Sequence, residues 1–113
     1  TNKFEAFARK VLGDLGLDRH FVSVIGGDSM GRAADGSFLA KPAPDPLIEA
    51  RRLCGSEAFA FVGDSSYDVR AARGAGVPVV VAGYGYCDAA PHELGGDAVI
   101  DSLAGLIAAL ERL

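Results

Sequence analysis

The stretch Phe59-Ala60-Phe61-Val62-Gly63-Asp64-Ser65-Ser66-Tyr67-Asp68 joins an apolar run to a Gly-Asp pair, and a second carboxylate follows four residues after the first. The apolar run predicts a buried strand that ends in an acidic turn. Asp64 would lie at the carboxyl edge of this strand and Asp68 one helical turn into the next element, so both side chains can face one point above the sheet. Carboxylates placed in this way suit a hard cation such as Mg2+. Taken alone, the pattern also fits a helix-capping acid followed by an exposed helix acid.

Composition restricts the class of protein. The chain has 113 residues, of which 50% are hydrophobic, as in a single globular domain. Its net charge is -4 and it contains no run of lysine or arginine, so we expect neither a nucleic-acid partner nor a membrane partner. No apolar segment has the ~20 residues of a membrane span, and no secretory signal is visible. Cys54 and Cys87 are too isolated for a disulfide framework, so a reduced cytoplasm is the expected compartment.

Apolar runs alternate with helical patterns along the chain. The predicted elements are, in order, a helix from Phe4 to Leu15, a strand at Phe21–Ile25, a helix at Pro46–Cys54 with Asp45 as its N-cap, a strand at Ala58–Val62, a helix at Ser66–Ala75, strands at Val77–Ala82 and Ala98–Ile100, and a helix at Leu103–Leu113. This alternation predicts an α/β fold with a Rossmann-like parallel sheet and helices on both faces. Residues 31–37 are predicted to be a surface loop, and residues 83–86 a flexible loop at the rim of the site.

A lysine stands upstream of the acidic turn, at the start of Lys41-Pro42-Ala43-Pro44-Asp45-Pro46, where Pro42 favours an extended backbone. Together with Thr1, Asp64 and Asp68, this lysine resembles the characteristic set of the haloacid dehalogenase-like hydrolase superfamily, and the surrounding sequence is similar to phosphoglycolate phosphatases. The resemblance covers essentially the whole chain. It is carried by the segments Thr1-Asn2-Lys3, Val24-Ile25-Gly26-Gly27-Asp28, Lys41 to Leu47, Phe61 to Asp68, and Ala75-Gly76-Val77-Pro78.

The resemblance implies a Mg2+-dependent phosphomonoester hydrolase that acts on a small phosphorylated metabolite such as 2-phosphoglycolate. In that reaction the Thr1 hydroxyl and the Asn2 backbone N–H would bind the substrate phosphate. Lys41 would neutralise both the phosphate and the attacking carboxylate. Asp64 would be the direct Mg2+ ligand, and Asp68 would bind the cation through water or orient the Lys41 ammonium.

The family reaction also needs an aspartate nucleophile, which forms an aspartyl-phosphate, and a second aspartate two residues later. These belong to a DxDG[TS] motif at the end of the first strand. Only Asp35-Gly36-Ser37 is superficially similar to this motif, but Ala33 stands at the nucleophile position and no apolar strand precedes it. The nucleophile is therefore expected in a segment absent from this chain.

In the family, a helical cap is inserted between that motif and the threonine that Thr1 resembles. The family sheet order is 3-2-1-4-5, in which Phe21–Ile25 would be the third strand and Ala58–Val62 the fourth. By this resemblance residues 1–113 are the C-terminal part of a catalytic core that lacks its first two strands and its cap. Strands without neighbours leave unpaired edges, so we expect the 113-residue chain alone to be unstable or inactive.

Other functions remain open at this stage. A noncatalytic phosphate-binding fragment, or a degenerate family member, would also lack the nucleophile. The activities of pyrophosphatase, sugar-phosphate phosphatase and phosphomutase relatives also remain open, because in this superfamily the cap largely determines the substrate. A receiver-like signalling domain is disfavoured, since its lysine follows the acidic positions whereas Lys41 precedes them.

Overall fold

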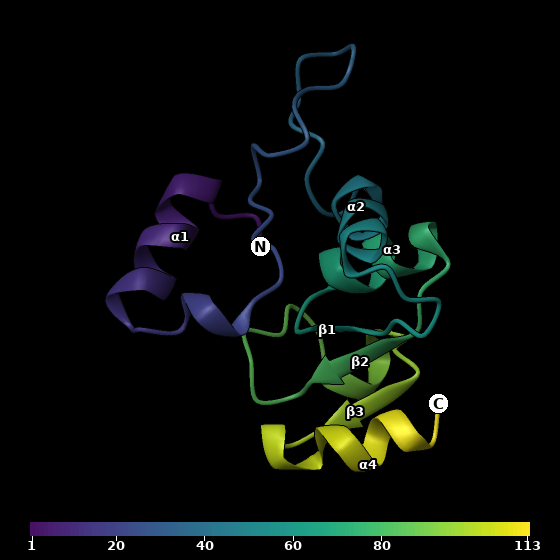
Figure 1. The fold of residues 1–113 in the computed structure, drawn as a ribbon. Coiled ribbons are helices and arrows are strands. Elements are labelled where there is room, and N and C mark those ends of the chain that lie inside the picture. The colour runs from purple at the N-terminus through teal and green to yellow at the C-terminus, as the bar shows by residue number, and fades with distance from the viewer.

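Three short parallel strands form the sheet of the molecule, with β2 in the centre (Figure 1). The computed structural model describes all residues from 1 to 113. The strands are β1 (Phe61–Gly63), β2 (Val79–Ala82) and β3 (Ala98–Ile100), in the order β1-β2-β3. Phe61 lies opposite Val79 in the register, and Val80 lies opposite Ala98. The prediction of a parallel sheet is confirmed.

Helices cover both faces of this sheet. Val79 and Val81 pack against α2 (Asp45–Cys54) and α3 (Ser66–Ala75), whereas Val80 packs against α4 (Leu106–Glu111). These valines alternate between the two sides because successive side chains of a strand point to opposite faces. All three are fully buried and form the centre of the core. The helices are α1 (Glu5–Asp14), α2 (Asp45–Cys54), α3 (Ser66–Ala75) and α4 (Leu106–Glu111), with 3-10 turns η1 (Asp18–His20), η2 (Pro91–Glu93) and η3 (Leu103–Gly105).

The start of α3 is fixed by a capping box. The Ser65 hydroxyl accepts a hydrogen bond from the Asp68 N–H, and the Asp68 carboxylate accepts one from the Ser65 N–H. The predicted N-cap of α2 is wrong. Pro44 occupies that position, and Asp45 is already the first helical residue because the proline's fixed backbone leads directly into the helix.

The N-terminal part of the chain, with α1 and η1, lies beside the sheet rather than on it (Figure 1). The predicted strand at Phe21–Ile25 is wrong, since these residues join no sheet. A strand needs a partner for its backbone N–H and C=O groups, and no other strand lies next to this segment. Ala8 is the only buried hydrophobic residue before Leu47, and Phe7 is 56% exposed.

Other predicted boundaries shift by a few residues. The strand expected at Ala58–Val62 is β1, which begins only where its residues can pair with β2. The last helix begins as the 3-10 turn η3 and continues as α4. Residues 31–37 form a surface loop, as predicted, which projects from the body of the molecule (Figure 1). None of the helices has both the length and the apolar character that crossing a membrane requires.

Candidate functional site

A buried ion pair connects the segment before α2 with the first turn of α3. The Lys41 Nζ donates a hydrogen bond to the Asp68 Oδ1. The Asp68 side chain is 4% exposed and that of Lys41 16% exposed. Two charges at this depth stabilise the fold only as a hydrogen-bonded pair, because either alone would be left without solvation. The structure therefore brings together two of the residues that the sequence selected.

The second oxygen of Asp68 is also fully engaged. Its Oδ2 accepts hydrogen bonds from the Asp64 N–H at 2.9 Å, the Ser65 N–H at 3.0 Å and the Ser65 hydroxyl at 3.0 Å. Burial, the largest influence, acts to raise the Asp68 pKa, but the hydrogen bonds and the charge of Lys41 outweigh it and hold this pKa below its usual value. The geometry matches the role of orienting the Lys41 ammonium, while a water-mediated metal contact of Asp68 stays a prediction.

Glycine at position 63 allows this close packing. A Cβ atom there would lie 2.3 Å from the Asp68 Cβ. No other residue type fits without displacing the carboxylate, since real Cβ atoms do not approach so closely. Gly63 of the Gly-Asp pair is thus required for the packing of the Asp68 side chain against β1.

Asp64 follows β1 at the carboxyl edge of the sheet, as predicted. Its Oδ2 accepts a hydrogen bond from the Tyr86 N–H at 2.7 Å, whereas no protein donor reaches its Oδ1. No three His, Cys, Asp or Glu side chains are arranged to hold a metal ion. Mg2+ commonly takes one or two carboxylates and completes its octahedron with water and substrate oxygens. The Asp64 carboxylate, with its Oδ1 left without a protein donor, therefore fits the oxygen ligation that Mg2+ requires, and its role as a direct ligand stays a prediction.

Asn2 holds the main chain of Lys41. The Asn2 Nδ2 donates to the Lys41 carbonyl oxygen at 2.9 Å, and the Lys41 N–H donates to the Asn2 Oδ1 at 3.1 Å. Sequence reasoning assigned Asn2 only a backbone contact to phosphate and missed this side-chain role. Thr1 and Lys41 line one hollow of about 150 Å³, together with Phe61. The structure thus places Thr1 and Asn2 beside the lysine.

The Gly26-Gly27-Asp28 segment holds these N-terminal residues in place. The Gly27 N–H donates to the Lys3 carbonyl oxygen at 2.7 Å, and the Asp28 Oδ1 accepts from the Glu5 N–H at 2.8 Å. A Cβ atom on Gly26 would lie 2.3 Å from the Glu5 nitrogen. Asp28 thereby satisfies a free N–H at the start of α1. The two glycines permit this segment and the N-terminal residues to touch.

The loop after β2 lies beside the site, as predicted, but hydrogen bonds fix it in place. In addition to the Tyr86 contact with Asp64, the Asp88 carboxylate accepts from the Ser66 N–H at 2.8 Å and from the Ser66 hydroxyl at 2.5 Å. These two hydrogen bonds lower the Asp88 pKa. Sequence reasoning missed Tyr86 and Asp88, although their position after a strand neighbouring Asp64 was an available signal.

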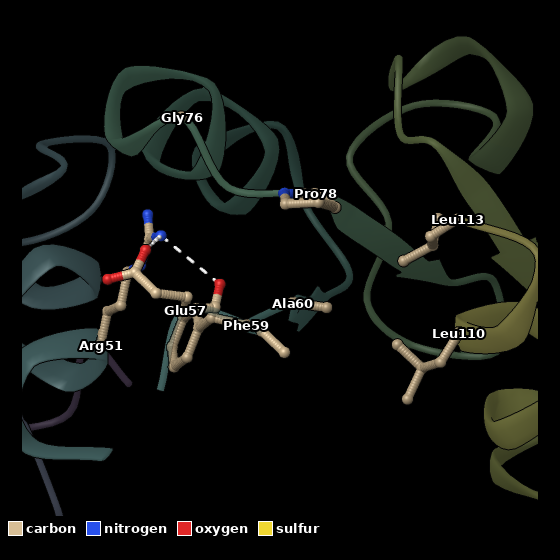
Figure 2. A pocket seen from close by; sticks show the side chains of 9 residues that line it. Arg51, Glu57, Phe59, Ala60, Gly76, Pro78, Leu110 and Leu113 are labelled. Atoms are coloured by element: carbon tan, nitrogen blue, oxygen red, sulfur yellow. Dashed lines mark hydrogen bonds and ion pairs between the residues drawn. The ribbon is translucent and has the colours of Figure 1, made fainter. Parts of the chain in front are cut away.

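A larger hollow, of about 530 Å³, lies at the opposite edge of the sheet (Figure 2). It is lined by the residues that precede β1 and β2, including Phe59 and Pro78, and by Leu110 and Leu113 of the C-terminal segment. An ion pair of 2.8 Å between Arg51 and Glu57 borders it. Ligands of parallel α/β sheets bind at the carboxyl ends of the strands, so this hollow is separate from the candidate site.

The parallel sheet, with a lysine and two aspartates at its carboxyl edge, indicates a class of hydrolase. A model of the haloacid dehalogenase-like hydrolase family matches residues 1–76, and the chain belongs to this family. Among its relatives, a phosphoglycolate phosphatase of Mesorhizobium japonicum is 39% identical over 116 residues, which cover 100% of this chain and 48% of the relative. A phosphoglycolate phosphatase of Cupriavidus necator is 41% identical over 113 residues, covering 97% of this chain and 46% of the relative.

Solved structures have the same fold. A haloacid dehalogenase-like protein of unknown function from Agrobacterium tumefaciens superimposes with a TM-score of 0.81 at 23% identity, covering 98% of this chain and 51% of that one. A predicted phosphoglycolate phosphatase from Haemophilus somnus superimposes with a TM-score of 0.74 at 29% identity, covering 88% and 43%. The chain spans about half the length of the relatives that it matches.

Proposed function

We propose that residues 1–113 are the C-terminal part of the catalytic core of a Mg2+-dependent phosphomonoester hydrolase of the phosphoglycolate phosphatase type. The observation that carries this proposal is the buried Lys41–Asp68 ion pair beside Asp64 at the carboxyl edge of the sheet. Relatives named phosphoglycolate phosphatase, matched over almost the whole of this chain, support a small phosphorylated substrate such as 2-phosphoglycolate.

Each residue has a distinct task in this proposal. The Thr1 hydroxyl and the Asn2 backbone N–H bind the substrate phosphate, and the Asn2 side chain holds Lys41 in register with it. The Lys41 ammonium, oriented by Asp68, offsets the negative charge that gathers when a carboxylate attacks a phosphate. Asp64 holds Mg2+, which supplies further positive charge at the phosphate when bound.

The nucleophile belongs to a segment absent from this chain. Within residues 1–113 the nearest match, Asp35, lies in an exposed turn, where its Oδ1 accepts hydrogen bonds from the Ser37 N–H and hydroxyl. Two observations support a missing strand pair. β1 is an edge strand, and a hollow of about 150 Å³ is lined both by Phe61 of β1 and by Ser23 of the segment 22–24, whose backbone forms no hydrogen bonds. An extended segment entering there would meet unpaired backbone on both sides.

The test uses the complete protein that contains this chain, with 2-phosphoglycolate and Mg2+. Asp64→Asn should abolish Mg2+-dependent phosphate release, because the direct ligand loses its charge. Lys41→Ala should lower kcat by about 100-fold to 1,000-fold, the usual cost of removing one electrostatic contact to a transition state. Lys10→Ala is the matched control, since Lys10 is an exposed lysine of α1 that pairs only with Asp14.

Near-normal turnover of Asp64→Asn or of Lys41→Ala would remove that residue from the mechanism. Binding of 2-phosphoglycolate without any turnover by the complete protein would contradict the hydrolase proposal. It would favour the alternative of a noncatalytic phosphate-binding protein.

A further inference from the structure

The loop from Gly83 to Asp88 contacts Asp64 and the first turn of α3. We propose that Asp88 is a positioning residue that holds this loop against Asp64 and thereby sets the orientation of the Asp64 carboxylate for a divalent cation. The inference rests on the proposed role of Asp64 as a metal ligand. It assigns a task to Asp88, which neither the sequence pattern nor the proposed function includes.

The first contact lies at Asp64 itself. The Tyr86 N–H donates to the Asp64 Oδ2 at 2.7 Å. Gly85 packs so closely that a Cβ atom there would lie 2.4 Å from the same oxygen. With Oδ2 held in this way, Oδ1 is the oxygen that is left for a cation. The position of the loop backbone therefore decides which way the carboxylate faces.

The second contact lies at Ser66, two residues after Asp64. Asp88 accepts two hydrogen bonds from Ser66, the first residue of α3, at 2.8 Å and 2.5 Å. Ser66 is only two residues from Asp64, so the loop meets the chain close to Asp64 at both contacts. A helix N-terminus also favours a carboxylate through its free N–H groups and its dipole.

Without Asp88 the loop would be poorly restrained. Apart from these contacts, its first residue is held by a hydrogen bond from the Gly83 N–H to the Ile100 carbonyl oxygen at 2.9 Å. Beyond Gly83, the loop has only a hydrogen bond from the Gly85 N–H to the Ala82 carbonyl oxygen at 3.0 Å and weak contacts of the Cys87 thiol. Its two glycines raise the entropy that is lost when the loop is fixed in one conformation. Removal of Asp88 is therefore expected to free the Tyr86 N–H and, with it, Asp64.

The experiment measures Mn2+ binding to the complete protein, by electron paramagnetic resonance of the free ion, and phosphatase kinetics at varied Mg2+. For Asp88→Ala we expect the Mn2+ Kd to rise by about tenfold, a usual cost of losing a residue that orients a metal ligand. The Mg2+ concentration for half-maximal rate should rise equally, while KM for the substrate at saturating Mg2+ stays unchanged. A general loss of structure would not separate these two quantities.

Two further variants test the mechanism. Asp88→Asn should retain wild-type Mn2+ affinity, because its amide oxygen accepts from the Ser66 N–H and its amide nitrogen donates to the Ser66 hydroxyl. Asp101→Ala is the matched control, since Asp101 is an exposed acid that follows β3. If Asp88→Ala does not fold, Ser66→Ala replaces it, because this change deletes the hydroxyl half of the contact and should also weaken Mn2+ binding.

Folded Asp88→Ala protein with the Mn2+ Kd of the wild type would overturn the inference, and so would an Asp88→Asn variant as impaired as Asp88→Ala. If the wild type binds Mn2+ and Asp64→Asn abolishes that binding while Asp88→Ala does not change it, the proposed function stands and only the role of Asp88 fails. A wild-type protein that binds no Mn2+ contradicts both.

Discussion

The N-terminal region (residues 1–28) and the sheet region (residues 41–113) have similar sequence patterns but different degrees of burial. In the sheet region, valines of β2 are fully buried between helices on two faces. In the N-terminal region a helix forms, yet Phe7 is 56% exposed and Val22 is 79% exposed. A helix satisfies its backbone groups internally, whereas a strand depends on a neighbour, so only the region that contains its own neighbours forms a sheet.

The largest expected difference between the regions is in hydrogen exchange. In the 113-residue chain, backbone amides of β2 should exchange more than about 100-fold more slowly than those of residues 22–25, because local opening costs far more in a packed strand than in an unpaired segment. Hydrogen exchange with mass spectrometry measures both. In the complete protein the proposed missing strands should slow exchange at residues 22–25, and equal protection of the two segments in the short chain would contradict the comparison.

A matched pair of valines tests the same comparison energetically. In the 113-residue chain, Val80→Ala should lower the free energy of unfolding by about 2 kcal/mol, through lost burial and a new cavity. Val22→Ala should change it by less than about 0.5 kcal/mol, since that side chain is exposed. Urea unfolding followed by circular dichroism provides both values. A loss at Val22 as large as that at Val80 would show that the N-terminal region is packed in solution.

Asn2 is a test of how the two regions are joined. In the complete protein, Asn2→Ala removes both hydrogen bonds to the Lys41 main chain and should lower kcat by about tenfold, at roughly 0.5–1.5 kcal/mol for each bond. Asn2→Asp keeps only the acceptor for the Lys41 N–H, so its kcat should lie between those of the wild type and Asn2→Ala. Steady-state kinetics with 2-phosphoglycolate checks the order, and an unchanged kcat for Asn2→Ala would mean that Lys41 is placed without it.

The smallest expected effect is a loss of stability at acidic pH. Because the Asp68 pKa is lowered by folding, ionised Asp68 adds stability above the unfolded value of about 3.9, and this contribution is lost as the pH falls through the folded pKa. Thermal unfolding of the 113-residue chain between pH 6 and pH 3 should therefore show a decline that Asp68→Asn reduces. An identical decline in the variant would assign the acid sensitivity to other groups.

Much of the sheet region could be predicted from sequence alone. The apolar run before Asp64, the spacing to Asp68 and the valines of β2 depend on local pattern, and the structure follows them closely. The segment 21–25 has an equally apolar pattern but forms no strand, because a sequence pattern cannot reveal whether a neighbouring strand is present. The cytoplasmic compartment and the lack of a nucleic-acid partner stay predictions.

The candidate site was predicted as a set of residues, but of its contacts only that between Asp68 and the Lys41 ammonium was predicted. Lys41, Asp64 and Asp68 were found because charged side chains in motif spacing stand out in a sequence. The side chains of Asn2 and Asp88 were overlooked, since each bonds to the backbone of a residue distant in sequence. Contacts of this kind depend on tertiary arrangement and have no spacing signature.

Lys41 is held at its main chain by Asn2 of the N-terminal region and at its ammonium by Asp68 of the sheet region, so its position depends on both regions of the molecule. Under the proposed function, a molecule whose N-terminal region has detached would keep its sheet, its helices α2 to α4 and its ion pair, yet its lysine would no longer be aligned with the substrate phosphate. Catalysis would then stop before the protein unfolds. An enzyme assay should therefore detect detachment of the N-terminal region before spectroscopy detects unfolding.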